Sequence, residues 1–123
     1  MTSRLRNALA AIEGVVESDS AFQKGLAYWV NGKEIAHFEG PAIDIRLTRE
    51  VIRQRRQDLK ADPRVHLRRS GSDWLEVAFT SPEDDEFVIE LVQAAAAAHR
   101  APPGTLVAPP PTGSDLARRR RFH

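Results

Sequence analysis

The 123-residue chain contains no cysteine and no uninterrupted apolar run longer than five residues. The absence of cysteine excludes disulfides, thiolate metal ligands and cysteine nucleophiles, and it is compatible with any redox compartment. A membrane-spanning helix needs about 20 mostly apolar residues, so no transmembrane helix is predicted. The N-terminal residues lack the continuous apolar stretch of a secretory signal, and the expected location is therefore cytoplasmic.

Motifs of common hydrolases and nucleotide-binding proteins are also missing. The sequence contains no G-x-S-x-G, H-E-x-x-H or S-x-x-K motif and no glycine-rich phosphate-binding loop. No cofactor is predicted on this basis. Whether the chain is an enzyme stays open at this point.

Charge and proline are distributed unevenly, although the net charge is only +1. Residues 101–123 hold four arginines and the single acid Asp115, which leaves 14 basic and 16 acidic residues in 1–100. Five of the eight prolines also fall in this C-terminal segment. Such a segment has little apolar area to offset the entropy of ordering. We predict a single domain over residues 1–100, followed by a flexible proline-rich tail over residues 101–123 that ends in an arginine run.

The periodicity of apolar residues predicts an α+β fold with the element order α-β-β-β-α-β-β-α. Three helices are expected, each with a capping signal: from a Thr2 or Ser3 cap to about residue 13, over 49–61 after Thr48, and over 82–99 after Ser81. Five strands are expected, over residues 22–30, 33–39, 43–47, 65–68 and 74–80. This order predicts a sandwich of one mostly antiparallel, twisted sheet with its helices packed on one face.

A two-residue turn at Asn31-Gly32 predicts the hairpin register. Val30 then pairs with Lys33, and counting outward pairs Tyr28 with Ile35 and Leu26 with His37. Alternation places His37 and Glu39 on one face of this hairpin and Trp29 and Glu34 on the other, without deciding which face is buried.

The later strands indicate an open sheet face. If their apolar sides face the helices, four other side chains occupy the opposite side: Asp44, Arg46, Trp74 and Glu76. These are the predicted ligand-binding residues, and the leading hypothesis is a binding or interaction module that uses this face. The partner would be an unidentified small molecule or protein. The simpler interpretation is a set of cross-strand ion pairs on a solvated sheet.

His37 and Glu39 are the candidate catalytic residues. A His-x-Glu pair on one strand face can orient an imidazole for acid-base catalysis or supply two metal ligands. A complete metal site would need a third ligand, Asp44 or His66, brought over by the fold, so no metal site is predicted. An enzyme with His37 as its acid or base remains an alternative function.

Nonspecific nucleic-acid binding is the second alternative. The basic candidates form a stripe at helical spacing and a terminal run: Arg49, Arg53, Arg56 and Lys60, then Arg118, Arg119, Arg120 and Arg121. Such groups neutralise phosphates, but an amphipathic surface helix also needs a polar face for solvation alone. The small residues Ala94–Ala98 permit close approach of a second helix, so a monomer or a weak dimer is expected.

The order of residues resembles a known family. Four segments and the acidic start of the helix expected over 82–99 carry the resemblance. The segments are Gly32 to Gly40 (GKEIAHFEG), Asp44 to Leu47, Arg64-Val65-His66 and Asp73-Trp74-Leu75. Over about residues 14–98 they resemble small microbial proteins described as luciferase-like domains, for which no activity or light emission is implied. His37 matches that family's first motif, whereas Glu39 stands where a second histidine is common. The element order is also similar to the YjbR-like fold, some of whose members are described as DNA-binding.

Overall fold

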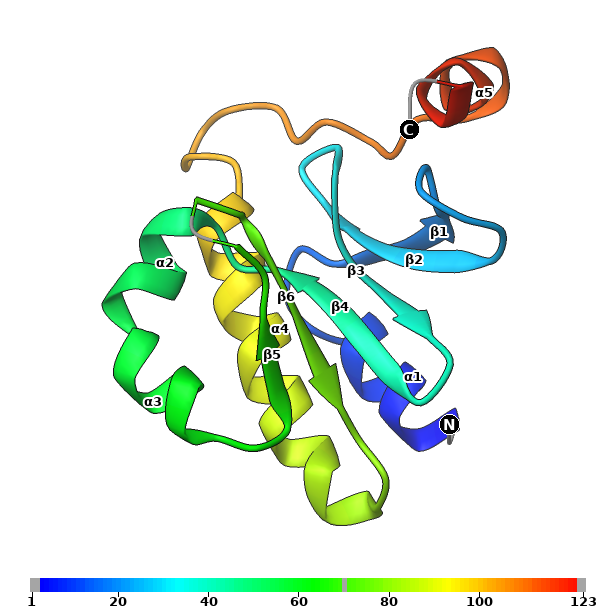
Figure 1. The fold of residues 1–123 in the computed structure, drawn as a ribbon. Helices are drawn as coiled ribbons and strands as arrows, with labels where there is room; N and C mark the ends of the chain where they lie inside the picture. The colour runs from blue at the N-terminus through cyan, green and yellow to red at the C-terminus, as the bar shows by residue number, and fades with distance from the viewer. Residues whose placement is uncertain (1–2, 70, 122–123) are drawn as a thin grey trace.

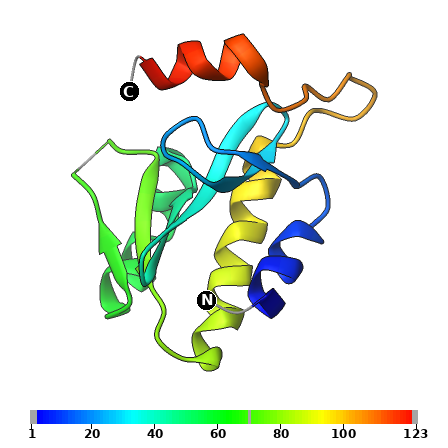
Figure 2. The same ribbon diagram turned by 90° about the vertical axis from the view of Figure 1, so that its right-hand side faces the viewer.

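A computed structural model describes residues 3–69 and 71–121. The expected cap at Thr2 lies outside these residues. The described residues form a six-stranded antiparallel sheet with helices packed against it (Figures 1 and 2). The predicted α+β fold is thereby confirmed. Of the helices in these residues, none combines the length and the apolar character that crossing a bilayer requires.

The sheet has the strand order β1-β2-β3-β4-β6-β5. Its strands are β1 (Val16–Asp19), β2 (Leu26–Val30), β3 (Lys33–Glu39), β4 (Ala42–Arg46), β5 (Val65–Leu67) and β6 (Trp74–Ala78). The helices are α1 (Ser3–Ala10), α2 (Arg49–Gln54), α3 (Arg56–Ala61), the 3₁₀ helix η1 (Pro82–Asp84), α4 (Asp85–His99) and α5 (Gly113–Arg121).

The main core lies between the sheet and helices α1 to α4. The apolar positions of β4 and β6 alternate as expected, so that Ile43 and Ile45 are buried beside Val77 and Leu75. From α4, Leu91 and neighbouring residues complete the same cluster. Each such side chain contributes about 1.5–3 kcal/mol of transfer free energy when fully buried. This cluster fixes one face of the sheet as the helix side.

A β-bulge in β3 changes the predicted hairpin register. The turn is as expected, with Asn31 and Gly32 at positive φ and Val30 paired with Lys33. Trp29 then pairs with Glu34, but Tyr28 pairs with Ala36, so Ile35 is an extra residue. Ile35 and Ala36 are both buried on the helix side. The predicted pairs Tyr28–Ile35 and Leu26–His37 are therefore wrong, and the register actually opposes Ala27 to His37.

Three further elements differ from the sequence prediction. The strand expected over 22–30 begins only at Leu26, because Ser20 Oγ accepts the backbone N–H groups of Phe22 and Gln23 and holds this segment as a loop. The short edge strand β1 was not predicted. The helix expected over 49–61 is divided at Arg55, whose backbone (φ −104°, ψ 9°) interrupts the α-helical path.

The C-terminal segment contains a helix that was not predicted. Helix α5 lies on the side of the sheet opposite the main core, over the end formed by β1 and β2 (Figure 2). Leu116 is 6% exposed and packs with Ala21, Ala27 and Trp29 in a second, smaller cluster. The Arg120 guanidinium donates two hydrogen bonds to the Ser20 carbonyl, at 3.0 and 2.8 Å. In this structure the tail therefore covers part of the open face.

Candidate functional site

Four buried polar side chains form one hydrogen-bonded network on the open face. Ser20, Glu34, His37 and Asp44 are each no more than 6% exposed, and in residues 4–69 and 71–121 the aromatic Tyr28 and Trp29 are the other side chains with polar groups buried to this degree. Ser20 Oγ donates to Glu34 Oε2 at 2.6 Å, and the Ala21 backbone N–H donates to Glu34 Oε1 at 2.6 Å. The bulge explains why Glu34 and His37, three residues apart on one strand, point to the same side.

His37 is the centre of this network. Its Nδ1 lies 2.9 Å from Glu34 Oε2, and its Nε2 lies 3.0 Å from Asp44 Oδ2. Burial by itself lowers the pKa of His37, but the hydrogen bond and charge of Glu34, together with those of Asp44, outweigh it and raise the pKa above its usual value. Arg68, which follows β5, donates from Nη2 to Asp44 Oδ1 at 3.0 Å. The structure thus favours an imidazolium held between two carboxylates.

Aromatic rings flank the imidazole. The ring centroid of Phe22 lies 5.8 Å from that of His37, and the Trp74 centroid lies 5.4 Å from it. Phe22 and Trp74 also contact each other edge to face, with centroids 5.2 Å apart. With Gln23, Glu39, Asp44 and Arg68, these residues line a cavity of about 450 Å³. A ligand in it would meet two aromatic surfaces and several charged or polar groups.

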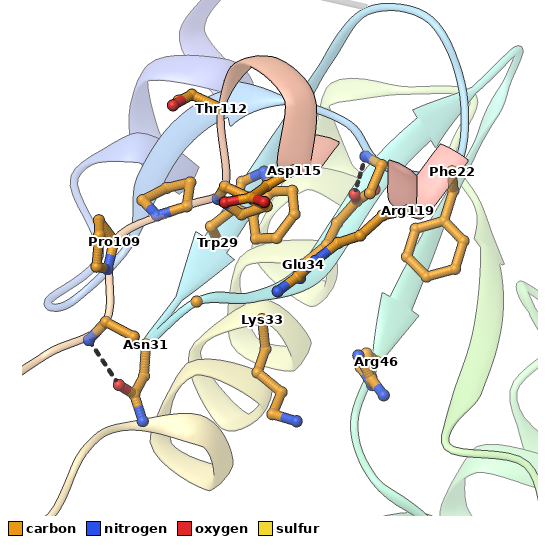
Figure 3. A pocket seen from close by; sticks show the side chains of 15 residues that line it. Phe22, Trp29, Asn31, Lys33, Glu34, Arg46, Pro109, Thr112, Asp115 and Arg119 are labelled. Carbon is orange, nitrogen blue, oxygen red and sulfur yellow. Dashed lines mark hydrogen bonds between the residues drawn. The ribbon is translucent and has the colours of Figure 1, made fainter. Parts of the chain in front are cut away.

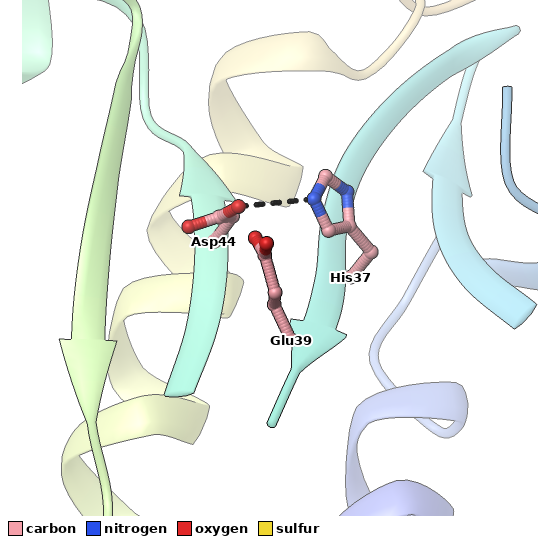
Figure 4. Close-up of side chains that lie close together, drawn as sticks. All are labelled: His37, Glu39 and Asp44. Carbon is pink, nitrogen blue, oxygen red and sulfur yellow. Dashed lines mark hydrogen bonds and ion pairs between the residues drawn. The ribbon is translucent and has the colours of Figure 1, made fainter. Parts of the chain in front are cut away.

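The sheet register aligns further titratable residues with His37. Asp44 opposes His37 on one side and Glu76 on the other, and Glu76 opposes His66. Directly opposed residues of antiparallel strands point to the same face, so these four side chains form a row across the open face. Glu39 lies beside the row, and its carboxylate points toward the space between His37 and Asp44 (Figure 4).

The predicted site residues are partly brought together. His37, Glu39, Asp44 and Trp74 line the 450 Å³ cavity, whereas Glu76 shares their face without lining it. Arg46 opposes Trp74, and its guanidinium carbon lies 5.7 Å from the Trp74 ring centroid. It lines a different cavity of about 650 Å³ between the sheet and the tail, into which Lys33 and Arg119 also point (Figure 3).

Sequence reasoning missed Ser20, Phe22 and Glu34 as site residues. Phe22 was assigned to a strand, and the hairpin alternation placed Glu34 on the face opposite His37. Two local features explain this. One is the loop held by Ser20 Oγ and the other is the one-residue bulge in β3, and neither produces a periodic signal in the sequence. Arg68 was not predicted as a site residue either, since nothing near it in the sequence indicates its contact with Asp44.

The basic candidates lie in separate places. Arg49, Arg53 and Arg56 line a cavity of about 330 Å³ together with Arg68 and Arg69, and Lys60 does not. The arginine run is in α5, which Figure 1 places on the other side of the molecule from α2 and α3. Within that run Arg118 pairs with Asp115 at 2.6 Å. The stripe and the run therefore do not form one continuous surface.

Comparisons of the chain with protein-family models, with curated proteins and with solved structures find no match. The resemblances to the luciferase-like and YjbR-like groups stay predictions. Function is accordingly argued from the geometry and chemistry of the site.

Proposed function

We propose that this protein is a binding module whose ligand occupies the 450 Å³ cavity on the open sheet face. The observation that supports it best is the burial of Ser20, Glu34, His37 and Asp44 in one network, of which His37 and Asp44 line that cavity. Buried ionic groups are often no more stabilising than apolar residues of the same size. A fold that needed only stability has no use for three ionisable side chains, those of Glu34, His37 and Asp44, buried at one place. Titratable groups with perturbed pKa values at a cavity are typical of functional sites.

The charge of the cavity favours a positively charged ligand. The carboxylates of Glu39 and Asp44 line it together with the His37 imidazole and the Arg68 guanidinium, and a third carboxylate, that of Glu34, is hydrogen-bonded to Nδ1 of the same imidazole. The balance of these groups is negative, more so when His37 is neutral. The faces of Phe22 and Trp74 also attract cations, at about 0.5–2 kcal/mol per contact. A small amine or amidinium with an attached apolar or aromatic part matches both features.

Two-dimensional NMR of the full chain tests this proposal. The probes are benzylamine, tryptamine and benzamidine, with benzyl alcohol and benzoate as neutral and anionic counterparts. We expect the cationic probes to shift the signals of His37 and the Trp74 indole N–H more strongly than their counterparts do. An equal response to all five probes, or no response at these residues, would overturn the proposal.

A matched pair of variants locates the binding. Asp44→Asn removes an arginine-paired carboxylate from the cavity. We expect this variant to lower the affinity for the cationic probes at least fivefold. Asp62→Asn is the control, because Asp62 is likewise paired with an arginine, Arg64, at 2.7 Å, but lies away from this cavity. Equal weakening by both variants would place the binding elsewhere.

A second candidate function is supported by the arginine-lined cavity of about 330 Å³. Five guanidinium groups around one cavity suit a phosphate-bearing molecule, including a nucleic-acid backbone. Titration with inorganic pyrophosphate and with a short DNA duplex at two salt concentrations tests it. Arg56→Gln with Arg69→Gln should abolish salt-sensitive binding, whereas Arg118→Gln with Arg121→Gln should leave it unchanged. The reverse pattern would mean nonspecific attraction to the C-terminal run.

A further inference from the structure

We propose that His37, Glu39 and Asp44 bind one divalent transition-metal ion through an imidazole nitrogen and two carboxylate oxygens. The inference rests on the same cavity as the proposed function and adds a second kind of cation, a metal ion, that this cavity can hold. The sequence offered only the pair His37 and Glu39. The fold supplies a third ligand, because β4 places Asp44 directly opposite His37.

The distances among the three donors are close to those of a metal site. One ligand atom from each residue lies within 4.8 Å of the others. Around a single Zn²⁺, with bonds of about 2.0–2.2 Å, ligand atoms are roughly 3–3.5 Å apart. Glu39 is exposed, so its side chain can close the difference by a small rotation. His37 and Asp44 are already held in place by the buried network.

The surroundings of His37 match those of a metal-binding histidine. Such a residue donates its other ring N–H to a carboxylate or carbonyl, which fixes the tautomer and the ring orientation. Glu34 stands in this position, 2.9 Å from Nδ1, and is itself held by Ser20 and the Ala21 backbone N–H. The imidazolium carries one proton on each ring nitrogen, Nδ1–H toward Glu34 and Nε2–H toward Asp44. A metal ion would take the place of the proton between Nε2 and Asp44, and that proton would be released to solvent.

The position of Glu39 distinguishes a metal site from an ordinary buried ion pair. Asp44 has Arg68 as a partner and Glu34 has Ser20, but Glu39 has no hydrogen bond or ion pair within residues 3–69 and 71–121. Its carboxylate nevertheless points toward His37 and Asp44 (Figure 4). The Glu39 carboxylate is thus the third one directed at His37, and within the described residues no cation forms an ion pair with it. Three protein ligands would leave further coordination positions open to the cavity, as in metal sites that bind a second molecule.

Metal titration of the full chain tests the inference. The protein is treated with EDTA, freed of chelator, and titrated with ZnCl₂ by calorimetry and with CoCl₂ by visible absorption. We expect one ion per chain, release of protons to the buffer, and a shift of the His37 ring signals in NMR. Glu39→Gln is the principal variant, because this exposed residue can be changed without disturbing the buried network. We expect it to weaken Zn²⁺ binding at least tenfold.

Glu76→Gln is the matched control. Glu76 opposes Asp44 on the same face but is not one of the three donors. A change of less than threefold is expected for this variant. Equal affinity of Glu39→Gln and Glu76→Gln, or Zn²⁺-induced shifts at His66 or His99 in place of His37, would overturn the inference, as would the absence of Zn²⁺ binding.

The two proposals can fail independently. If the amine probes move His37 and Trp74 but Zn²⁺ does not bind, the metal inference is wrong and the binding module stands. If Zn²⁺ binds with the expected dependence on Glu39 but the amine probes have no effect on the metal-free chain, the organic ligand is wrong and the metal site stands.

Discussion

The two faces of the sheet bury their side chains by different means. Toward the helices, Ile43 and Ile45 of β4 pack among apolar residues. Their burial is favourable without any one specific partner. Toward the other side, Asp44, which lies between them, is buried by specific hydrogen bonds and an ion pair. Apolar burial contributes in proportion to area, whereas a buried polar group stabilises only when each partner is in place. The helix side therefore supplies most of the stability of the fold. The open face, which we call the network side, fixes the relative positions of its buried polar side chains.

The largest effect should come from the helix side. Leu75 is fully buried, opposite Ile45 and Leu67. We expect Leu75→Ala to lower the free energy of unfolding by about 2–5 kcal/mol, because it removes apolar contacts and leaves a cavity. Urea unfolding measures it. The neighbouring Glu76→Ala is the control, with an expected change of less than about 1 kcal/mol. Similar losses for both variants would contradict the contrast between the faces.

An intermediate effect is expected within the network. Glu34→Gln places an amide N–H₂ where a carboxylate oxygen now accepts, so at least one buried donor loses its acceptor. The expected loss of unfolding free energy is about 1–3 kcal/mol. Glu39→Gln, on the same strand but exposed, should change it by less than about 0.5 kcal/mol. If Glu34→Gln proved neutral in urea unfolding, the network would not be as rigid as described.

A smaller effect is expected where α5 covers the open face. Leu116→Ala weakens the cluster with Ala21, Ala27 and Trp29 without touching the main core. Because Leu116 is the buried residue of α5, we expect its loss to let α5 separate from the sheet locally. The expected result is faster amide hydrogen exchange in residues 113–121 and in β2, and a red-shifted Trp29 emission, with little change in global unfolding. Leu106→Ala is the control, because Leu106 is 97% exposed. Unchanged exchange in Leu116→Ala would contradict the packing of α5.

The smallest effect concerns pH and compares two histidines. His99, at the end of α4, has its pKa lowered mainly by burial, with further lowering by Arg46 and Lys33, against which the Ala95 carbonyl and Asp73 act. The pKa of His37, on the open face of the sheet, is instead raised by Glu34 and Asp44 against the effect of burial. Because the folded pKa of His99 lies below its unfolded value of about 6.5, the unfolded chain takes up this proton first and stability falls as pH falls through that value.

We therefore expect the urea midpoint of the wild type to decrease more than that of His99→Gln when the pH is lowered from about 7.5 to about 5.5. The difference between the two chains isolates His99 from all other titrating groups. An equal decrease in both would mean that His99 is protonated as readily in the folded state as in the unfolded chain.

Local signals in the sequence predicted the helix side well. The alternation of Ile43, Ile45 and Leu47 identified β4. Ser81 to Asp84 identified the helical start at η1 and α4, where the Asp84 carboxylate accepts the N–H groups of Thr80 and Ser81. The open-face residues Asp44 and Trp74 followed from the same alternation, whereas for His37 it predicted a shared face with Glu39 without deciding which face that is. These features depend on neighbours within a few residues, which a single sequence contains.

The rest of the site depends on events that periodicity does not encode. Glu34 joins His37 only because one extra residue changes the alternation of β3. Phe22 contacts the imidazole from a loop. Arg68 donates to Asp44, which lies 24 positions earlier in the sequence. Helix α5 was missed because a proline-rich, strongly basic segment has almost no apolar periodicity, and the single residue Leu116 carries its packing.

The bulge at Ile35 also bears on how this chain would vary during evolution. Because Ile35 and Ala36 both face the helices, a chain that lacked one residue here would keep His37, Glu39 and Phe38 on their present sides of the sheet. Insertions and deletions inside strands normally exchange the two faces. At this position a single-codon deletion would cost one buried side chain and leave the network in place. A one-residue gap in the middle of β3 is thus the alignment feature by which divergent relatives that retain the same site would be recognised.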